Sequence, residues 1–151
     1  MRYISKKDYL EKVEDSIVGY ALYVLDKIKK NDYVRLATGN TVKVMGIKEN
    51  KVNKKAIYYG IYKHDWFDSS AVENFSDNIM DLIQDKDIVE IELSEEFVEK
   101  KDKKKLIQIG DIYTKEILQK DIDNGIITRI LTILSYNQYM ANCYKVGGED
   151  E

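Results

Sequence analysis

Several residue types are absent or scarce in this chain of 151 residues. Proline is absent, so turns depend on glycine, asparagine, aspartate and serine. Cys143 is the single cysteine, which excludes a disulfide within the chain and suggests a reducing compartment. No apolar run approaches the roughly 18 residues of a membrane-spanning helix, and the first residues lack the apolar core of a signal peptide. We therefore expect a cytoplasmic protein with no membrane partner.

Positive charge is not in excess either. The chain has 24 Lys and Arg residues against 27 Asp and Glu residues, a formal net charge of -3. Such a balance provides no overall field for nucleic acid, although local basic patches can still bind it. Arginine, the usual side chain for bidentate recognition of guanine or phosphate, occurs only as Arg2, Arg35 and Arg129. This scarcity argues against sequence-specific reading of DNA.

The residues that usually carry catalysis or bind transition metals are scarce as well. His64 is the single histidine and Cys143 is remote from it in sequence, so a transition-metal site would need carboxylates alone. No Walker loop, G-x-G-x-x-G or nucleophile motif occurs. Acidic pairs such as Glu95-Glu96 are more often solvated than they are general acid–base pairs. We predict no enzymatic activity, no metal and no cofactor.

The clearest helix signal runs from Ser5 to Lys30. Ser5 is a good N-cap, and three lysines lie in the last turn, where the helix dipole favours cations. We predict one amphipathic helix, residues 1–30 as a segment, packed on a sheet. A second interpretation stays open, in which the wide apolar stripe pairs with another copy of the chain or with a partner. The stripe consists of Leu10, Val13, Ile17, Ala21, Val24 and Ile28, widened by Tyr9, Tyr20, Tyr23 and Leu25.

Short alternating segments separated by turn residues fill the rest of the chain. The pattern predicts a hairpin over 33–48 with its turn at Gly39-Asn40. Ser76 is expected to start a short helical turn, and Ser135 to cap a short C-terminal helix. The segment 115–125 fits either a short helix or an extended stretch. The other predicted strands are 56–63, 88–93, 106–114 and 126–134.

One short sequence motif, which we call the repeated phrase, occurs twice at an offset of 55 residues. Each copy places an isoleucine four residues before an aspartate and then begins a β-branched or aromatic run. The spacing recurs a third time at Ile107 and Asp111, which chance can also produce in an Ile- and Asp-rich chain. The aligned residues are Ile28, Asp32 and Val34 in the first copy and Ile83, Asp87 and Val89 in the second.

Repeated short strands of this kind are typical of small barrels. We predict an α+β fold in which an N-terminal amphipathic helix packs on two small SH3-like or barrel-like units, followed by a short C-terminal helix. The first β unit is expected over 27–75 and the second over 76–146, within one compact domain. Residues 147–151 form an acidic tail.

Three segments also resemble a known family. KIKKNDYVRLATGNTVKVMGI (27–47), FSDNIMDLIQDKDIV (75–89) and ILTILSYNQYMANCYKV (130–146) are similar, in this order, to segments of uncharacterised proteins of prophages and mobile elements in low-GC Gram-positive bacteria. That family has glycine where this chain has Asn31 and Lys86. The resemblance implies a small β-rich fold, a phage origin and the cytoplasm of a bacterial host. It implies no activity.

Three aromatic residues form the first candidate interface. Side chains alternate along a strand, so Tyr58 and Tyr62 would share one face of the segment 56–63, followed closely by Trp66. Tyrosine and tryptophan are enriched at protein interfaces and can also stack on bases. The alternative is that the sheet core covers one face of this strand and the N-terminal helix covers the other.

Acidic residues form a second candidate interface, suited to a basic, nucleic-acid-binding surface on a target protein. With the phage resemblance, they favour a non-enzymatic binding protein that covers a host protein. Inhibition of a host defence system, in the manner of anti-CRISPR proteins, is expected by analogy. The residues are Asp85, Asp87, Glu90, Glu92, Glu95 and Glu96.

Two alternatives remain. The densest basic cluster could hold a phosphate backbone, which would make the chain a nucleic-acid-binding small β-barrel, yet such a cluster is more typical of a solubilising hairpin tip. The second alternative is an oligomer that sequesters a nucleotide signal. Homo-oligomerisation through the N-terminal helix is expected in that case. The basic cluster consists of Lys100, Lys101, Lys103, Lys104 and Lys105.

Overall fold

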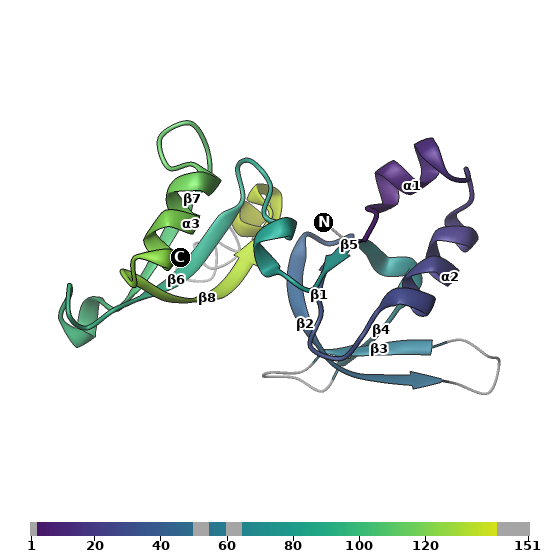
Figure 1. The fold of residues 1–151 in the computed structure, drawn as a ribbon, viewed down its shortest axis with the longest axis horizontal. Helices are drawn as coiled ribbons and strands as arrows, with labels where there is room; N and C mark the ends of the chain where they lie inside the picture. The colour runs from purple at the N-terminus through teal and green to yellow at the C-terminus, as the bar shows by residue number, and fades with distance from the viewer. Residues whose placement is uncertain (1–2, 50–54, 60–64, 142–151) are drawn as a thin grey trace, which may run out of the picture. The chain divides into compact units, whose positions relative to one another are not determined.

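The computed structural model describes residues 3–49, 55–59 and 65–141 (Figure 1). The chain divides into two compact units, Met1–Leu82 and Ile83–Glu151. Each unit combines helices with an antiparallel sheet, so the predicted α+β class is confirmed. Within the described ranges, no helix is long and apolar enough to cross a membrane.

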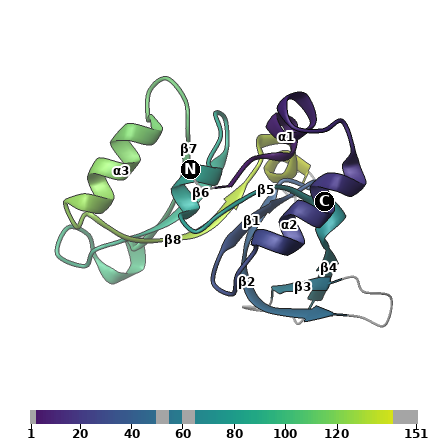
Figure 2. The ribbon, with the colours of Figure 1, turned by 45° about the vertical axis from the view of Figure 1, so that its right-hand side comes forward.

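Five antiparallel strands form the sheet of the first unit. The strand β1 lies between β2 and β5, β2 also pairs with β3, and β3 pairs with β4. The order is therefore β4-β3-β2-β1-β5, and β1, β2 and β5 lie side by side in both ribbon views (Figures 1 and 2). The strands are β1 (Tyr33–Leu36), β2 (Asn40–Glu49), β3 (Lys55–Tyr59), β4 (Asp65–Asp68) and β5 (Val72–Ser76).

The hairpin predicted over 33–48 is confirmed, but the central residues of its turn are Ala37 and Thr38, two positions before the predicted Gly39-Asn40. The backbone N–H of Gly39 donates to the carbonyl oxygen of Leu36 at 2.8 Å. The φ angle of Gly39 is 98°, a left-handed conformation that glycine adopts without steric cost. Asn40 is already the first residue of β2.

Two helices occupy the N-terminal segment for which the sequence predicts one. They are α1 (Lys6–Lys12) and α2 (Ile17–Lys27), and Ser5 caps α1 as predicted. The interruption follows from Ser16, whose Oγ accepts the N–H of Gly19 at 2.9 Å and so starts a second helix. The apolar spacing continues across this interruption, which is why periodicity alone predicts a single helix.

Helical and strand residues share the core of the first unit. Tyr20 and Val24 of α2 are buried in one cluster with Val34 of β1 and Phe75 of β5. The Tyr3 ring stacks on Phe75 with 4.3 Å between ring centroids. One side of α2 is therefore held firmly by the unit to which it belongs.

Two short 3-10 helices complete this unit, η1 (Ser69–Ala71) and η2 (Ile79–Leu82). The Ser76 side chain accepts the N–H of Asn78 at 3.1 Å. The Asn78 side chain in turn accepts the N–H of Met80 at 3.0 Å, so the helical turn predicted after Ser76 is confirmed.

The second unit is built on three antiparallel strands, with β6 between β7 and β8. The segment 115–125, for which the sequence allowed two conformations, contains a helix. Thr114 caps it by accepting the N–H of Ile117 at 3.2 Å. Ser135 caps a helix over 136–141, as predicted, by accepting the N–H of Gln138. The remaining elements are β6 (Ile88–Leu93), η3 (Lys100–Asp102), β7 (Lys104–Gln108), α3 (Lys115–Asp123) and β8 (Ile127–Leu134).

The first copy of the repeated phrase forms a tight turn before β1. The Asp32 carboxylate accepts the backbone N–H of Lys29 at 2.9 Å, while the Asp32 N–H donates to the Lys29 carbonyl at 3.1 Å. Asn31, between them, has a φ angle of 77°. The Asn31 N–H donates to the carbonyl of Val44, and the Val44 N–H donates to the carbonyl of Asp32, both at 2.8 Å, which joins the turn to β2.

The second copy repeats every one of these bonds. The Asp87 carboxylate accepts the N–H of Gln84 at 2.7 Å, and the Asp87 N–H donates to the Gln84 carbonyl at 3.1 Å. Lys86 has a φ angle of 72°. Ile109 corresponds to Val44. The Ile109 carbonyl accepts the N–H of Lys86, and the Ile109 N–H donates to the carbonyl of Asp87. The repeat is therefore structural.

The strands after the two turns pair in the same register. In each unit the central strand pairs with the next strand of the chain on one side and with the last strand of the unit on the other. Thus β1 lies between β2 and β5, and β6 lies between β7 and β8. Ile107 lies within β7, so the third Ile-to-Asp spacing does not form this turn. The matched sets of Cα partners are Val42–Val34–Phe75 and Ile107–Val89–Ile133.

Candidate protein interface

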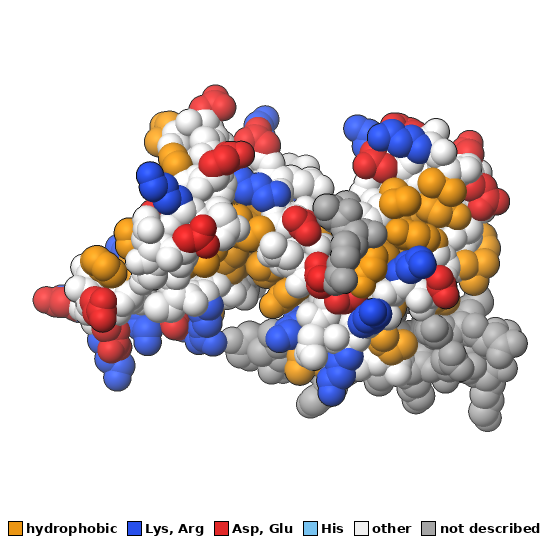
Figure 3. All heavy atoms as spheres, viewed as in Figure 1, with side chains coloured by type: hydrophobic (Ala, Val, Ile, Leu, Met, Phe, Trp, Pro, Cys, Tyr) orange, Lys and Arg blue, Asp and Glu red, His pale blue; other side chains and the backbone are white. Residues whose placement is uncertain are grey.

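The helix α2 exposes an apolar face. Val18 and Leu22, one helical turn apart, are 71% and 60% exposed, and Ile17 beside them is 59% exposed. We call these three residues the α2 face. In Figure 3, hydrophobic side chains gather over α1 and α2, with charged side chains around them. Contiguous exposed apolar patches mark protein or membrane interaction sites more often than chance.

A groove of about 190 Å³ runs beside the α2 face. Its helical wall is apolar, and its other wall is polar because it is formed by the start of η1. There the Asp68 carboxylate accepts the N–H of Ser70 at 3.1 Å and caps that short helix. The lining residues are Ile17, Val18, Ala21, Leu22, Leu25, Asp68, Ser69 and Ser70.

The opposite side of α2 is anchored, which makes the exposed face rigid. The Tyr20 hydroxyl donates to the carbonyl of Ile4 at 3.1 Å, and the Tyr23 hydroxyl accepts the N–H of Ile4 at 3.0 Å. Burial raises the pKa of the Tyr20 hydroxyl far above its ordinary value, so it stays a neutral donor. A helix that is apolar on nearly all sides normally has all sides covered, and α2 has one side open.

The sequence pattern missed this face. It assigned Val13 and Ile17 to the buried stripe, but they are 57% and 59% exposed. The α2 helix begins anew at Ser16, so the residues around this start do not continue the core-facing stripe of α1. A signal existed in Val18 and Leu22, an apolar pair at a spacing of four residues that lies outside the predicted stripe.

The predicted aromatic face is described only in part. Tyr58 and Trp66 are Cα partners in the ladder between β3 and β4. Tyr62 and His64 lie outside the described residues. The outward aromatic face therefore stays a prediction.

The acidic residues do not form one free surface. Asp87 is 2% exposed and its carboxylate holds the second turn, so this side chain is not part of the free surface. The Arg129 guanidinium donates to Glu92 at 3.1 Å, and this bond lowers the pKa of the Glu92 carboxyl. Glu95 lies 3.6 Å from the Lys103 ammonium. Asp85, Glu95 and Glu96 are exposed, whereas Glu90 and Glu92 are half-buried.

The basic cluster lies on η3 and the first half of β7. Lys101 is 3.5 Å from Glu99, and Lys103 is 3.6 Å from Glu95, so carboxylates offset part of its charge. Lys104 and Lys105 are exposed on β7, at the edge of the described sheet of this unit. Lysines on an edge strand discourage pairing with other chains, which is the solubilising interpretation of this cluster.

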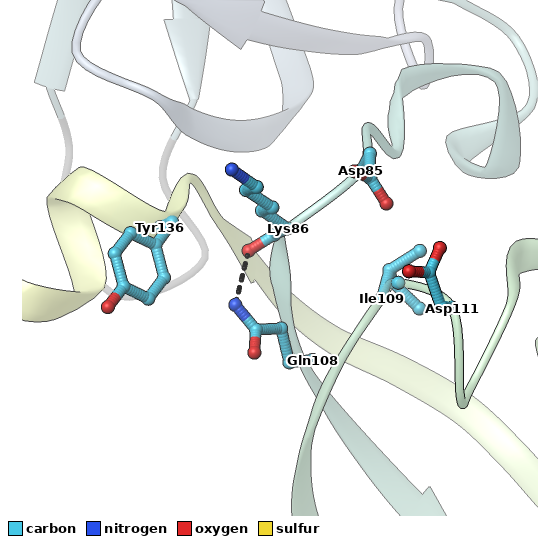
Figure 4. A pocket seen from close by; sticks show the side chains of 7 residues that line it. Asp85, Lys86, Gln108, Ile109, Asp111 and Tyr136 are labelled. Atoms are coloured by element: carbon cyan, nitrogen blue, oxygen red, sulfur yellow. Dashed lines mark hydrogen bonds between the residues drawn. The ribbon is translucent and has the colours of Figure 1, made fainter.

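A second hollow, of about 450 Å³, lies at the repeated turn of the second unit (Figure 4). The Gln108 side chain donates to the Lys86 carbonyl at 3.4 Å across its floor. Over the described ranges, no group of three or more His, Cys, Asp or Glu residues could hold a metal ion. The lining is mostly polar, in contrast to the groove beside α2: Asp85, Lys86, Gln108, Ile109, Gly110, Asp111 and Tyr136.

No known family, curated protein or solved structure matches this chain. The geometry of the described residues points to the α2 face as the candidate site. The α2 face combines large exposed apolar side chains, an adjoining groove and a rigid, capped helix. The acidic and basic sets lack that combination, and the ion pairs Glu95–Lys103 and Glu92–Arg129 already offset part of their charge.

Proposed function

We propose that this chain is a non-enzymatic binding protein that acts by protein–protein contact through the α2 face. The observation that carries the proposal is the exposure of Val18 and Leu22, 71% and 60%, on a helix whose other side is fixed in the core. Burying such a side chain stabilises a complex by roughly 1.5–3 kcal/mol when it is fully removed from water. A rigid helix loses little conformational entropy on binding, which favours the complex further.

The partner we propose is a host protein, and the target class is a component of a host defence system, as for anti-CRISPR proteins. Its support is the resemblance of 27–47, 75–89 and 130–146 to proteins of prophages and mobile elements. The step from phage origin to defence inhibition is an analogy. A cytoplasmic location belongs to the same proposal, because such targets act there.

The architecture we propose for the β region is a pair of small SH3-like or barrel-like units. Its support is the identical bonding of the Asp32 and Asp87 turns and the shared register of the strands that follow. Small barrels commonly serve as binding modules.

Affinity capture from a lysate of a low-GC Gram-positive host tests the binding function. The full chain is compared with a Val18→Glu/Leu22→Glu variant and with Ile112→Glu as a matched control. Ile112 is 95% exposed in the second unit, so the control places a glutamate at an exposed apolar site elsewhere, one added charge against the two of the double variant. We expect the native chain and the control to retain one stoichiometric host protein that the double variant loses.

Two outcomes contradict the proposal. Equal retention by the double variant would place the binding surface elsewhere. Recovery of no stoichiometric protein by the native chain would argue against protein contact as the function.

A further inference from the structure

We infer that the α2 face is self-complementary and that the free protein pairs with a second copy through it, with the two α2 helices antiparallel. A target that binds the same face would displace the second copy. Only this displacement step rests on the proposed function. Self-pairing itself rests on the charge and the shape of α2, and the length of the helix sets the strength of the pair.

The two ends of α2 carry opposite charge. Glu14 and Asp15 precede the helix, and Lys29 and Lys30 follow it, all four exposed. Asp26 in the last turn lies 3.7 Å from the Lys27 ammonium, so these two charges offset each other and Lys29 and Lys30 keep this end positive. In an antiparallel pair, the acidic end of each copy meets the basic end of the other, so the attraction occurs twice. A parallel pair would place like charges together, which is unfavourable. Charge therefore selects the antiparallel arrangement.

The groove offers space for an apolar side chain from the second copy. It lies directly beside Leu22, which points into solvent. Ala21 and Ser69 in its lining are small, and small residues at a helix contact allow close approach. A two-fold axis at this position lets each copy place an apolar side chain against the groove of the other.

The helix is short, and this sets the strength of the pair. With 11 residues, α2 is about 16 Å long. A contact of this length buries less than the roughly 800 Å² per partner of a standard interface. We therefore expect a dimer with a dissociation constant of order 10–100 μM. A dimer of this strength gives way to a tighter-binding target.

Sedimentation velocity on the full chain at low ionic strength tests the pairing. The native chain is expected to convert reversibly from monomer to dimer as its concentration rises across the micromolar range. Val18→Glu and Leu22→Glu should each stay monomeric, and the control Ile112→Glu should dimerise as the native chain does. All these side chains are exposed, so far-ultraviolet circular dichroism should be unchanged in every variant.

Charge reversal tests the antiparallel arrangement. Asp15→Lys and Lys30→Glu should each weaken the dimer by about tenfold, because each turns two attractions into two repulsions. The double variant Asp15→Lys/Lys30→Glu should bind more tightly than either single variant, because residues 15 and 30 again carry opposite charges, while Glu14 and Lys29 keep each end neutral overall. Glu14 is left unchanged since its carboxylate accepts the Tyr9 hydroxyl at 3.2 Å.

The results separate the two proposals. A native chain that is monomeric at every concentration, or a dimer that survives Val18→Glu and Leu22→Glu, overturns self-pairing. A double reversal that dimerises no more tightly than either single reversal overturns the antiparallel arrangement. If the native chain is monomeric but host-protein capture still depends on Val18 and Leu22, self-pairing fails and the proposed function stands. If the dimer forms as described but capture ignores these residues, the proposed function fails and self-pairing stands.

Discussion

The carboxylate of Asp87 accepts a hydrogen bond from the backbone N–H of Gln84 at 2.7 Å. Asp32 makes the same bond to Lys29 in the first unit at 2.9 Å. Both aspartates are buried, with 2% and 5% of their surface exposed, immediately before the central strand of their unit. One buried side chain thus closes the turn from which each sheet begins.

Removing either carboxylate should destabilise the chain. Asp87→Ala and Asp32→Ala should each lower the free energy of unfolding by about 2 kcal/mol, since hydrogen bonds to charged groups are worth roughly 1.5–3 kcal/mol. Asn variants retain an acceptor oxygen and should lose less. Urea denaturation followed by circular dichroism measures the change. A loss below about 0.5 kcal/mol for both Ala variants would show that the carboxylates do not stabilise the turns.

Replacing Lys86 by glycine should stabilise the second turn. Its φ angle of 72° is a left-handed conformation that costs a residue with a Cβ roughly 1–2 kcal/mol. The greater entropy of glycine in the unfolded chain offsets part of this, so we expect a net gain of about 0.5–1 kcal/mol. Asn31→Gly is the matched control, because asparagine tolerates its φ of 77° better and should gain less. A larger gain at Asn31 than at Lys86 would contradict this account.

Charging the α2 face should leave stability nearly unchanged. Val18→Glu and Leu22→Glu should each shift the free energy of unfolding by less than about 0.5 kcal/mol, because both side chains lie in solvent. Leu82→Ala, at 0% exposed in the same unit, should cost about 2–5 kcal/mol. Thermal and urea denaturation give both values. A severe loss from either glutamate variant would mean that the face is packed against the chain itself.

Arg129 should make the charge of Glu92 resistant to acid. The hydrogen bond from Arg129 lowers the Glu92 pKa below 4.5, so its stabilising contribution is complete above that pH and is lost as pH falls through the lowered pKa. Arg129→Gln should raise the Glu92 pKa toward 4.5 in a carbon-detected NMR titration of the carboxyl. The stability difference between the native chain and this variant should vanish in strong acid. An unchanged Glu92 pKa would show that the pair does not form in solution.

The basic cluster should not retain oligonucleotides. Lys101 and Lys103 lie close to Glu99 and Glu95, which lowers the local positive charge. Gel shift at low salt should show no complex for the native chain. A salt-sensitive complex that Lys103→Glu/Lys104→Glu abolishes would instead support the nucleic-acid-binding alternative.

Hydrogen bonds between residues close in sequence form the turns before the central strands and the starts of the helices. An aspartate four residues after an isoleucine forms the same turn at Asp32 and at Asp87, because its partner is a backbone N–H three residues away. Ser5 and Ser135 cap helices for the same reason. These side-chain bonds close within a few residues, so the caps at Ser5 and Ser135 could be predicted from the sequence. The turn needs more than the spacing, because Ile107 and Asp111 share the spacing and do not form it.

Exposure, in contrast, depends on what the other elements cover. The apolar spacing of the N-terminal segment is equally compatible with a buried Ile17 and with the 59% exposure observed. In the sequence, Asp87 looks like a surface charge. Asp87 is nevertheless buried, because its turn is joined by backbone hydrogen bonds to a distant segment of the unit. Periodicity shows that a side chain is apolar and on which side of its own helix it lies. Whether a second layer packs there is decided only when distant strands and helices assemble, and at Val18 and Leu22 no described element does so.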